Sequence, residues 1–307
     1  MNQHPQPQAQ APSTALVLVA FATIYIVWGS TYFFIQKAIA DFPPFLMGAI
    51  RFLVAAAIMF GWALWKKEPL RNVAMIKIAL VTGFLLLFIG NGAVIWAEKT
   101  IPSSLVAIFI SSAPLWFVLL DKPKWKANLS NSKIILGLLI GFAGVLLLFS
   151  QQLRDLLSGQ LSAEIAGFGI LVIGSMSWAG GSLYSKYKSQ GSALANTAWQ
   201  MLAGGVIFLL VSGLAGEWQT FHFSRVSTSG WLSMLYLIFF GSIAAYSAYV
   251  WLLTVRPATQ VSTYAYVNPV VAVLLGVFFA GERLSVLQVA GLAVILLSVL
   301  LINQSKK

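Results

Sequence analysis

The sequence predicts an all-α polytopic membrane protein with ten transmembrane helices, arranged as two inverted five-helix repeats. Hydrophobic residues make up 59% of the 307 residues and charged residues only 9%, against roughly 25% charged residues in soluble domains. Ten apolar stretches are long enough to cross a bilayer core, which takes about 20 helical residues. The chain also repeats itself, since three residues of the first half return 155 positions further on: Trp96, Pro102 and Pro114 as Trp251, Pro257 and Pro269.

Short connections separate the predicted spans and leave no room for an inserted soluble domain. The spans cover residues 15–35, 44–65, 76–97, 103–121, 133–150, 164–185, 193–214, 230–253, 258–280 and 284–303. Because each copy holds an odd number of spans, the second copy enters the membrane from the opposite side, and the halves relate by a pseudo-two-fold axis in the membrane plane. Pro102 and Pro257 stand where the fourth and ninth spans begin, a position where proline costs no hydrogen bond.

The loops carry Lys and Arg unevenly. Alternate loops hold thirteen of these residues on one side and five on the other, with Arg51 left inside the second span. Loops rich in Lys and Arg stay in the cytoplasm, so both termini are expected there. The formal net charge of +11 does not indicate nucleic-acid binding, because no basic domain stands apart from the spans. Residues 1–14 are polar and rich in Gln and Pro, which predicts a disordered tail and not a signal peptide.

The first span carries a stripe of Tyr25, Trp28, Tyr32 and Gln36, spaced as one face of a helix. Such aromatic residues either form an interfacial belt or line a cavity. Trp28 lies deeper than the two tyrosines, and its indole N–H needs an acceptor. Its counterpart in the sixth span is Trp178, on a stripe that also carries serines. A polar stripe inside a membrane helix must face protein or water, which makes both tryptophans candidates for a binding site.

The second and third spans hold ionisable residues. Arg51 either has a structural role, snorkelling or clamping backbone carbonyls, or binds an anionic group of a solute; its counterpart in the repeat is Gln200. Asn91 and Glu98 are seven residues apart and share one helix face. Glu98 either forms a solvated ion pair with Lys99 or carries a proton into the cavity.

Pro114 and Pro269 stand in the middle of the fourth and ninth spans. A proline there leaves the carbonyl four residues earlier without its usual donor, which is costly in lipid. These carbonyls belong to Ile110 and Ala265. Either a neighbouring hydroxyl such as that of Ser111 satisfies the kink, or the bend shapes a watery cavity and acts as a hinge.

Polar faces on the eighth and ninth spans are the strongest of the chain. Ser242, Tyr246 and Tyr249 share one face of the eighth span, and Tyr264 and Asn268 share one face of the ninth. These side chains either hydrogen-bond between helices or contact a solute. Asn268 is the preferred single candidate, because an amide beside a proline can serve the freed backbone or a substrate. In the fifth span, the Gly137–Gly141 run indicates close helix packing within the bundle.

The chain resembles the EamA family of the drug/metabolite transporter superfamily, and within it the YedA-like transporters. The matching segments are WGSTYFFIQKAI, FPPFLMGAIRFLVAA, GNGAVIWAE, IPSSLVAIFISSAPLW, GSMSWAGGSLY and STYAYVNPVVAVLLG followed by GERLS. The resemblance implies an inner-membrane carrier that moves small metabolites, often outward, by alternating access around a central cavity. It also implies EamA-type repeats over residues 15–150 and 164–303. DKPKWKANLS replaces GERLS in the first half, so the acidic residue of that motif is not mirrored.

Function is expected at the interface of the halves. The candidate substrate-binding residues are Trp28, Tyr32, Asn91, Ser111, Trp178, Tyr246, Tyr249, Tyr264 and Asn268. Glu98 is the candidate coupling residue, and Pro114 and Pro269 are the candidate hinges. No phosphate-binding loop occurs, so transport is expected to be secondary, with proton-coupled export of amino acids or related amphipathic compounds preferred over a facilitator or exchanger.

Other classes fit less well. An intramembrane lipid-modifying enzyme needs paired acids, histidines or a metal set at membrane depth, whereas His4 and His222 lie in the tail and a loop. A channel needs a ring of like charges or a filter loop, and neither is visible. With no cysteine in the chain, neither a thiolate metal site nor a disulfide can form. No cofactor is expected, the partners are a small solute and the bilayer, and the protein is expected to be a monomer or homodimer.

Overall fold

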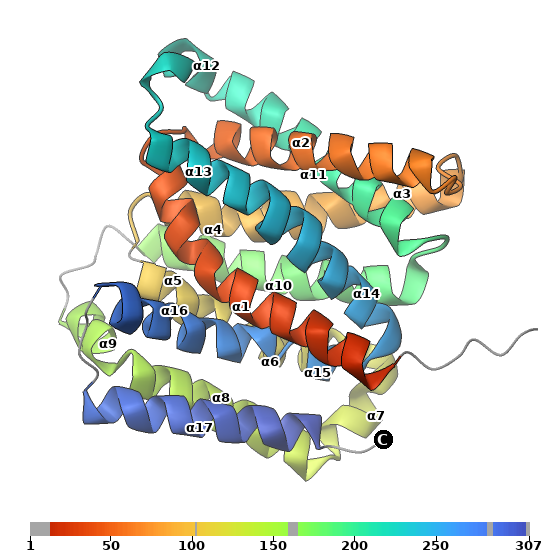
Figure 1. The fold of residues 1–307 in the computed structure, drawn as a ribbon. Helices are drawn as coiled ribbons and strands as arrows, with labels where there is room; N and C mark the ends of the chain where they lie inside the picture. The colour runs from red at the N-terminus through yellow and green to blue at the C-terminus, as the bar shows by residue number, and fades with distance from the viewer. Residues whose placement is uncertain (1–12, 102, 159–164, 281–284, 305–307) are drawn as a thin grey trace, which may run out of the picture.

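The computed structural model describes residues 13–101, 103–158, 165–280 and 285–304, and within these every regular element is a helix (Figure 1). Six helical stretches are long and apolar enough to cross a membrane: Thr14–Ile39, Pro44–Trp65, Val73–Ala97, Ala193–Leu214, Thr228–Val255 and Val286–Asn303. A shorter apolar helix covers Ser132–Leu148. The prediction of an all-helical protein with several apolar spans is confirmed.

The first half contains eight helical pieces of the predicted spans. They are α1 (Thr14–Ile39), α2 (Pro44–Trp65), α3 (Val73–Thr82), η1 (Gly83–Asn91), α4 (Gly92–Ala97), α5 (Ser103–Ile110), α6 (Ala113–Leu120) and α8 (Ser132–Leu148). Short connecting helices are η2 (Lys122–Lys124), α7 (Trp125–Leu129) and α9 (Ser150–Leu157).

The second half follows the same order. Its long pieces are α10 (Ile165–Lys188), α11 (Ala193–Leu214), α13 (Thr228–Tyr236), η5 (Leu237–Tyr246), α14 (Ser247–Val255), α15 (Ala258–Val261), α16 (Tyr264–Ala280) and α17 (Val286–Asn303). Short connections are α12 (Glu217–Thr220) and η4 (Phe223–Arg225). Every stretch predicted as a span is helical over most of its described length.

Several helices begin at a side chain that accepts a hydrogen bond from the first turn. These caps are Ser13, Asn72, Asn131, Ser192, Ser227 and Ser285. Pro43 precedes α2 and has no side chain for this role. The carboxylate of Glu217 takes its place, accepting from the backbone N–H groups of Phe45 (3.3 Å) and Leu46 (2.8 Å). The start of α2 is thereby tied to α12.

Two π-helical segments interrupt otherwise α-helical spans and occupy matching positions in the two halves. The segment η1 follows α3 and leads into α4, and η5 follows α13 and leads into α14. π-Helical turns are rare and occur mostly at functional sites. Apolar periodicity did not predict them, because a π-turn depends on which neighbours accept or fill the widened backbone.

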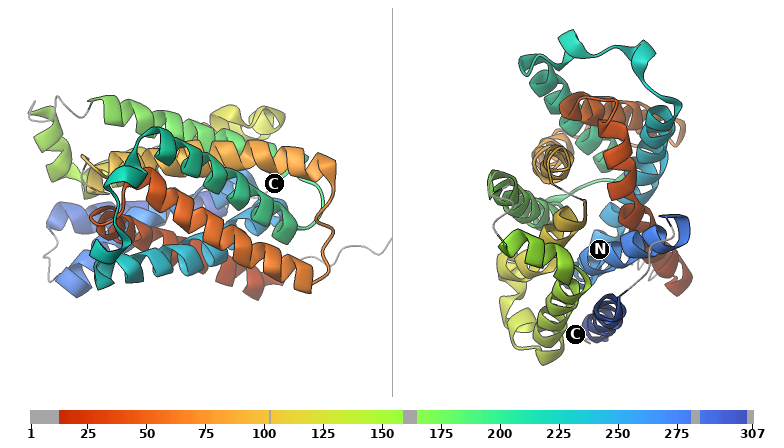
Figure 2. Two further views of the ribbon diagram at one scale, coloured as in Figure 1. Left: turned by 90° about the horizontal axis from the view of Figure 1, so that it is seen from above. Right: turned by 90° about the vertical axis from the view of Figure 1, so that its left-hand side faces the viewer.

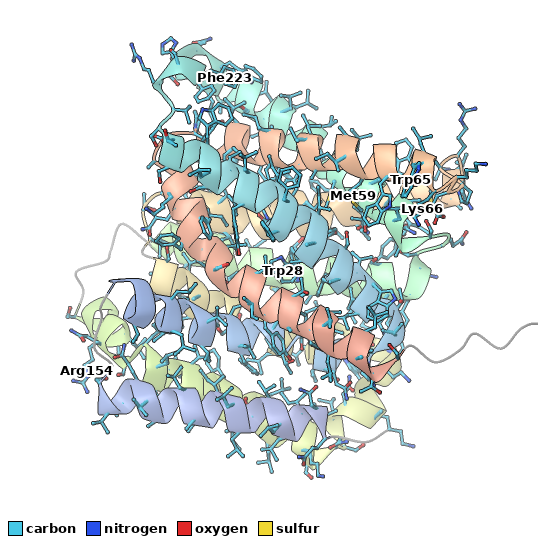
Figure 3. The ribbon with its side chains drawn as sticks, in the orientation of Figure 1. Trp28, Met59, Trp65, Lys66, Arg154 and Phe223 are labelled. Carbon is cyan, nitrogen blue, oxygen red and sulfur yellow. The ribbon has the colours of Figure 1, made fainter. Side chains whose placement is uncertain are left out.

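The helices lie side by side, and the most extensive contacts join elements of different halves. Helix α2 packs on α11, α8 on α17, α1 on α16 and η5, and α10 on η1, α5 and α6. Seen along the bundle, α8 and α17 lie at one side and α2 and α11 at the opposite side (Figure 2). The start of α1 and the end of α17 lie at the same end of the bundle (Figure 1). Lys66 also lies at this end, and Arg154 and Phe223 at the other (Figure 3).

The glycine run in α8 packs inside the bundle, as the sequence predicted. A Cβ atom on Gly137 would lie 2.5 Å from a side-chain carbon of Ile302, and one on Gly141 would lie 2.6 Å from the hydroxyl of Ser298 and 2.7 Å from the ring of Tyr266. Real Cβ atoms do not come this close to other heavy atoms. These two glycines therefore let α8 approach α16 and α17.

The two mid-span prolines differ from each other. The fourth span is interrupted between α5 and α6, and Pro114 lies in the first turn of α6, where its missing N–H costs nothing. The interruption of the fourth span thus falls directly before Pro114, and its role as a hinge stays a prediction. Pro269 lies inside α16, as predicted. Pro257 directly precedes α15, which confirms it as a helix starter, and Pro102 lies outside the described residues.

Candidate functional site: a cavity between the halves

Trp28, which Figure 3 labels near the middle of the bundle, is one of the residues that line a small cavity. Its volume, counted as the space open to the centre of a water molecule, is about 70 Å³. Its walls come from both halves: Trp28, Thr31, Tyr32, Ile35, Arg51, Gly90, Asn91, Val94, Ile110, Ala113, Gly174, Ser175, Trp178, Tyr264 and Asn268. Six of the nine predicted substrate-binding residues are therefore brought together.

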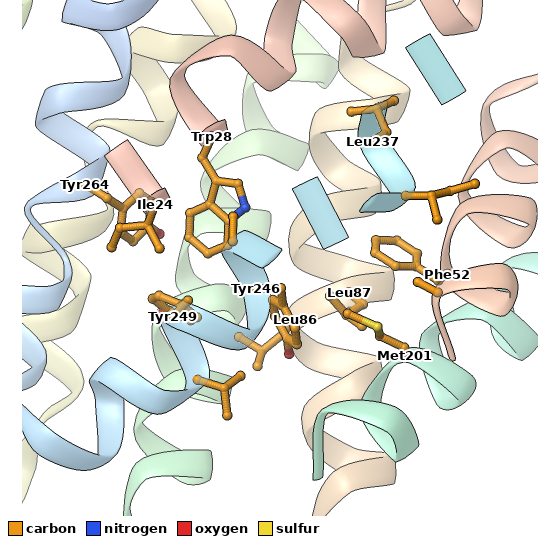
Figure 4. Packing of buried hydrophobic residues seen from close by; sticks show 14 of the residues in the cluster. Ile24, Trp28, Phe52, Leu86, Leu87, Met201, Leu237, Tyr246, Tyr249 and Tyr264 are labelled. Carbon is orange, nitrogen blue, oxygen red and sulfur yellow. The ribbon is translucent and has the colours of Figure 1, made fainter. Parts of the chain in front are cut away.

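Aromatic rings form one side of this cavity. The ring centroid of Trp28 lies 5.5 Å from that of Trp178, 5.0 Å from Tyr249 and 5.0 Å from Tyr264. The Trp28 ring meets the rings of Trp178 and Tyr264 edge to face, a favourable geometry for π-systems. Figure 4 shows the rings of Trp28, Tyr249 and Tyr264 gathered around one point. The aromatic stripes predicted on separate helices thus form one cluster.

Hydrogen bonds fix these rings. The indole N–H of Trp28 donates to the carbonyl of Gly241, in η5, at 3.1 Å. The indole N–H of Trp178 donates to the hydroxyl of Tyr249 at 3.0 Å. Tyr249 itself lies behind the cavity wall and forms a second hydrogen bond, of 2.5 Å, with Ser182. Tyr249 is not among the lining residues of this cavity, and its contact with a substrate stays a prediction.

Tyr246 and Ser111 also lie away from the cavity wall. The hydroxyl of Tyr246 donates to Gln200 at 3.0 Å, which joins η5 to α11. The hydroxyl of Ser111 lies 2.9 Å from the carbonyl oxygen of Ala265. This carbonyl is the one that Pro269 leaves without its helical donor, so Ser111 satisfies the kink from the other half, as one sequence interpretation held.

Unsatisfied polar atoms lie at and beside the cavity. The side-chain oxygens of Asn268 and Ser175 are buried and have no hydrogen-bond partner within the described structure. The Asn268 side chain interacts with the hydroxyl of Tyr32. Buried polar atoms without partners are rare in proteins, and a bound solute or water would complete them. Both oxygens belong to residues that line the cavity.

Glu98 is buried, with 5% of its surface exposed, whereas Lys99 is exposed. Both carboxyl oxygens of Glu98 lack a hydrogen-bond partner among the described residues. The interpretation of Glu98 as half of a solvated ion pair with Lys99 is therefore wrong. The carboxyl group interacts electrostatically with Tyr32, which lines the cavity.

Arg51 lines the cavity and is 2% exposed. Its Nε donates to the hydroxyl of Ser242 at 2.8 Å, and its Nη1 donates to Oδ1 of Asn91 at 3.4 Å. These acceptors belong to η5 and η1, so one side chain joins the two π-segments. The expectation that Arg51 snorkels or clamps backbone carbonyls is wrong, because its partners are side chains inside the bundle.

Glycines and small residues complete the wall, and the sequence analysis did not select them for the site. A Cβ atom on Gly90 would lie 3.0 Å from the ring of Trp178, and one on Gly174 would lie 2.5 Å from the Cβ of Ala93. The signal that could have found them is positional, because Gly90 directly precedes the predicted Asn91 and Gly174 stands four residues before the predicted Trp178. Small residues there let η1 and α10 approach each other.

The cavity can bind a small solute but cannot enclose a large one in this conformation. A water molecule needs roughly 10 to 15 Å³ on the same measure, so about 70 Å³ holds a few waters. Within the described residues, no three His, Cys, Asp or Glu side chains come together as a metal site would require. The cavity wall consists of aromatic faces, one guanidinium, amides and hydroxyls, and these groups can bind a solute by stacking and hydrogen bonding.

Comparison with known proteins places this geometry in a family. The profile of the EamA-like transporter family matches the chain twice, over residues 14–150 and 165–304. An Escherichia coli K12 protein named uncharacterized inner membrane transporter YedA is 37% identical over 94% of this chain and 90% of its own length. A Salmonella typhimurium protein named probable amino-acid metabolite efflux pump is 26% identical over 91% and 92%.

Solved structures are also similar in fold. A protein known from its crystal structure superposes with a TM-score of 0.75 and 19% sequence identity, covering 95% of this chain and 98% of its own. Together with the two family matches, the relatives identify a membrane transporter with a small-molecule substrate. The chain belongs to the EamA-like transporter family.

Proposed function

We propose that the chain is a secondary transporter that exports amino acids or related small amphipathic metabolites across the inner membrane by alternating access. The carrying observation is the central cavity, whose wall combines aromatic faces with unsatisfied polar atoms from both halves. A solute with an apolar side and polar groups would occupy both kinds of surface. The relative named as an amino-acid metabolite efflux pump supports this substrate class and direction.

The proposal includes ten spans in two inverted repeats, over residues 15–150 and 164–303, with both termini cytoplasmic. The contacts α2 with α11 and α8 with α17 pair each helix with its counterpart, and α1 contacts η5 as α10 contacts η1. Exchange of the halves leaves this pattern unchanged, as a two-fold axis requires. The basic residue Lys66 lies at the end of the bundle where α1 begins and α17 ends, which supports a cytoplasmic location for both.

Proton coupling through Glu98 is the second part of the proposal. Its carboxyl group is buried without a hydrogen-bond partner among the described residues and interacts electrostatically with Tyr32, which lines the cavity. A carboxylate in such surroundings is costly, so burial favours the protonated group and contact with water favours its release. A carboxyl group that alternates between these surroundings would carry one proton per cycle.

Counterflow in proteoliposomes tests the function. Vesicles loaded with each amino acid in turn are diluted into a trace of the labelled compound, and accumulation marks a substrate. Trp28→Ala should lower counterflow by about tenfold or more, since it removes the centre of the aromatic cluster. Trp62→Ala is the matched control, because Trp62 lies on α2 with 45% of its surface exposed. Movement of sugars or nucleotides but of no amino acid would refute the substrate class.

A further inference from the structure

Arg51 is a buried cation with donors to spare. A guanidinium has five N–H donors, and two of its nitrogens form the hydrogen bonds to Ser242 and Asn91. Both acceptors are neutral, and the bond to Asn91 is long at 3.4 Å. The Cζ atom lies 4.9 Å from the ring centroid of the neighbouring Phe52. Its third nitrogen, Nη2, forms no hydrogen bond to another described residue, and Arg51 lines the cavity.

No carboxylate balances this charge within the described structure. The hydrogen bonds of Arg51 in the described structure go to two neutral side chains, and both carboxyl oxygens of Glu98 lack a hydrogen-bond partner among the described residues. The two groups therefore do not form a pair. A charge inside a membrane protein normally pairs with another group or marks the path of a substrate. Arg51 thus has no anionic hydrogen-bond partner among the described residues.

The repeat itself argues against a purely structural need for a cation. Gln200, the counterpart of Arg51, is equally buried but does not line the cavity. Its amide donates to the hydroxyl of Thr82 at 2.9 Å and accepts from Tyr246 at 3.0 Å, so both ends are satisfied. The second half therefore packs a neutral side chain, Gln200, at the position that Arg51 occupies in the first half. Packing alone does not explain why the first half has a charged side chain there.

We propose that Arg51 binds the carboxylate of the solute, which makes the cargo a carboxylate-bearing compound; this inference rests on the proposed transport function. Guanidinium and carboxylate match geometrically and form paired, charge-assisted hydrogen bonds. Trp28, Trp178 and Tyr264 face the same cavity and receive the apolar part of the solute. A phosphate carries about two charges near neutral pH, and Arg51 is the one Lys or Arg among the described cavity residues, so a carboxylate fits better.

Matched ligands test this assignment by binding alone. The intrinsic fluorescence of the purified full chain in detergent is titrated with phenylalanine, leucine and methionine, and with the amide of each, which has the same skeleton without the negative charge. Inorganic phosphate serves as a second anion. The amino acids should bind at least about tenfold more tightly than their amides, and phosphate should bind more weakly than the amino acids.

Three variants separate recognition from structure. Arg51→Gln, which copies the side chain of the other half, should reduce the acid-to-amide ratio to about one. Arg51→Lys keeps the charge and should retain a preference for acids, and it preserves the test if Arg51→Gln does not fold. Gln200→Met changes the equivalent buried position and should leave the ratio unchanged. Equal binding of acid and amide to the wild type, discrimination that survives in Arg51→Gln, or no carboxylate binding at millimolar concentration would each overturn the assignment.

The same proteins in counterflow distinguish this inference from the proposed function. If carboxylates bind through Arg51 but are not transported, the role of Arg51 in carboxylate binding stands and the proposed transport function is refuted. If the wild type and Arg51→Gln transport neutral or cationic metabolites equally well, the transport function stands and the role of Arg51 in carboxylate binding is refuted.

Discussion

The hydroxyl of Ser111 stabilises a helix of the other half. It lies 2.9 Å from the carbonyl oxygen of Ala265 and 2.7 Å from that of Ala107. The carbonyl of Ala107 already accepts from the backbone N–H of Ser111 at 3.0 Å. The carbonyl of Ala265 has lost its helical donor, because residue 269 is proline. The Ser111 proton is therefore needed at Ala265.

Ser111→Ala should destabilise the protein by about 1 to 2 kcal/mol. A buried acceptor left unsatisfied costs about 1 to 3 kcal/mol, and hydrogen bonds between membrane helices contribute about 0.6 to 2 kcal/mol. In a Pro269→Ala background the restored N–H can bond the carbonyl of Ala265, so the same substitution should cost less than about 0.5 kcal/mol. The two positions should thus be coupled by about 1 kcal/mol.

A double-mutant cycle measures this coupling. The free energy of unfolding is determined in mixed micelles for the wild type, Ser111→Ala, Pro269→Ala and the double variant. Ser112→Ala is the control, because its hydroxyl donates to the carbonyl of Phe109 and accepts from the indole N–H of Trp116, both in the same half, and it should show no coupling to Pro269→Ala. Equal costs of Ser111→Ala in both backgrounds would refute the reasoning, since the carbonyl would then have another donor.

Three further outcomes are expected. Gly174→Ala should cost about 1 to 3 kcal/mol, because the new Cβ meets Ala93 at 2.5 Å, whereas Gly169→Ala in the same helix meets nothing within 4 Å and should be neutral or stabilising in thermal unfolding. Glu98→Gln should remove the dependence of counterflow on an imposed pH gradient; a full dependence in this variant would exclude the group as proton carrier. Glu217→Gln should cost about 1 kcal/mol, because two N–H groups of α2 lose a charged acceptor, and an unchanged melting temperature would contradict this.

The spans could be predicted because long apolar stretches can be read directly from the sequence. Pro44–Trp65 and Ala193–Leu214 begin and end where the sequence placed the second and seventh spans. The π-segments and the break between α5 and α6 could not be predicted this way. They depend on which backbone groups find partners in other helices, as when Ser177 of α10 donates to the carbonyl of Leu85 in η1.

The aromatic part of the site was predictable and its charged part was not. Trp28, Trp178 and Tyr264 stand on polar stripes that cannot face lipid, so the pattern alone directs them inward. A single ionisable residue such as Arg51 or Glu98 has several structural explanations, and only its neighbours decide between them. The neighbours of Arg51 come from η5 and η1, some 190 residues and 40 residues away along the chain.

The asymmetry of charge between the halves has a mechanistic meaning. If two related halves exchange conformations, the inward-open and outward-open states have nearly the same backbone energies, because each half adopts the form that the other leaves. Direction and selectivity must then come from residues that are not repeated. Arg51 is replaced by Gln200, and Leu253 stands 155 positions after Glu98. The first half thus supplies Arg51 and Glu98 without counterparts in the second, and a solute bound to one half would bias an otherwise balanced pair of states.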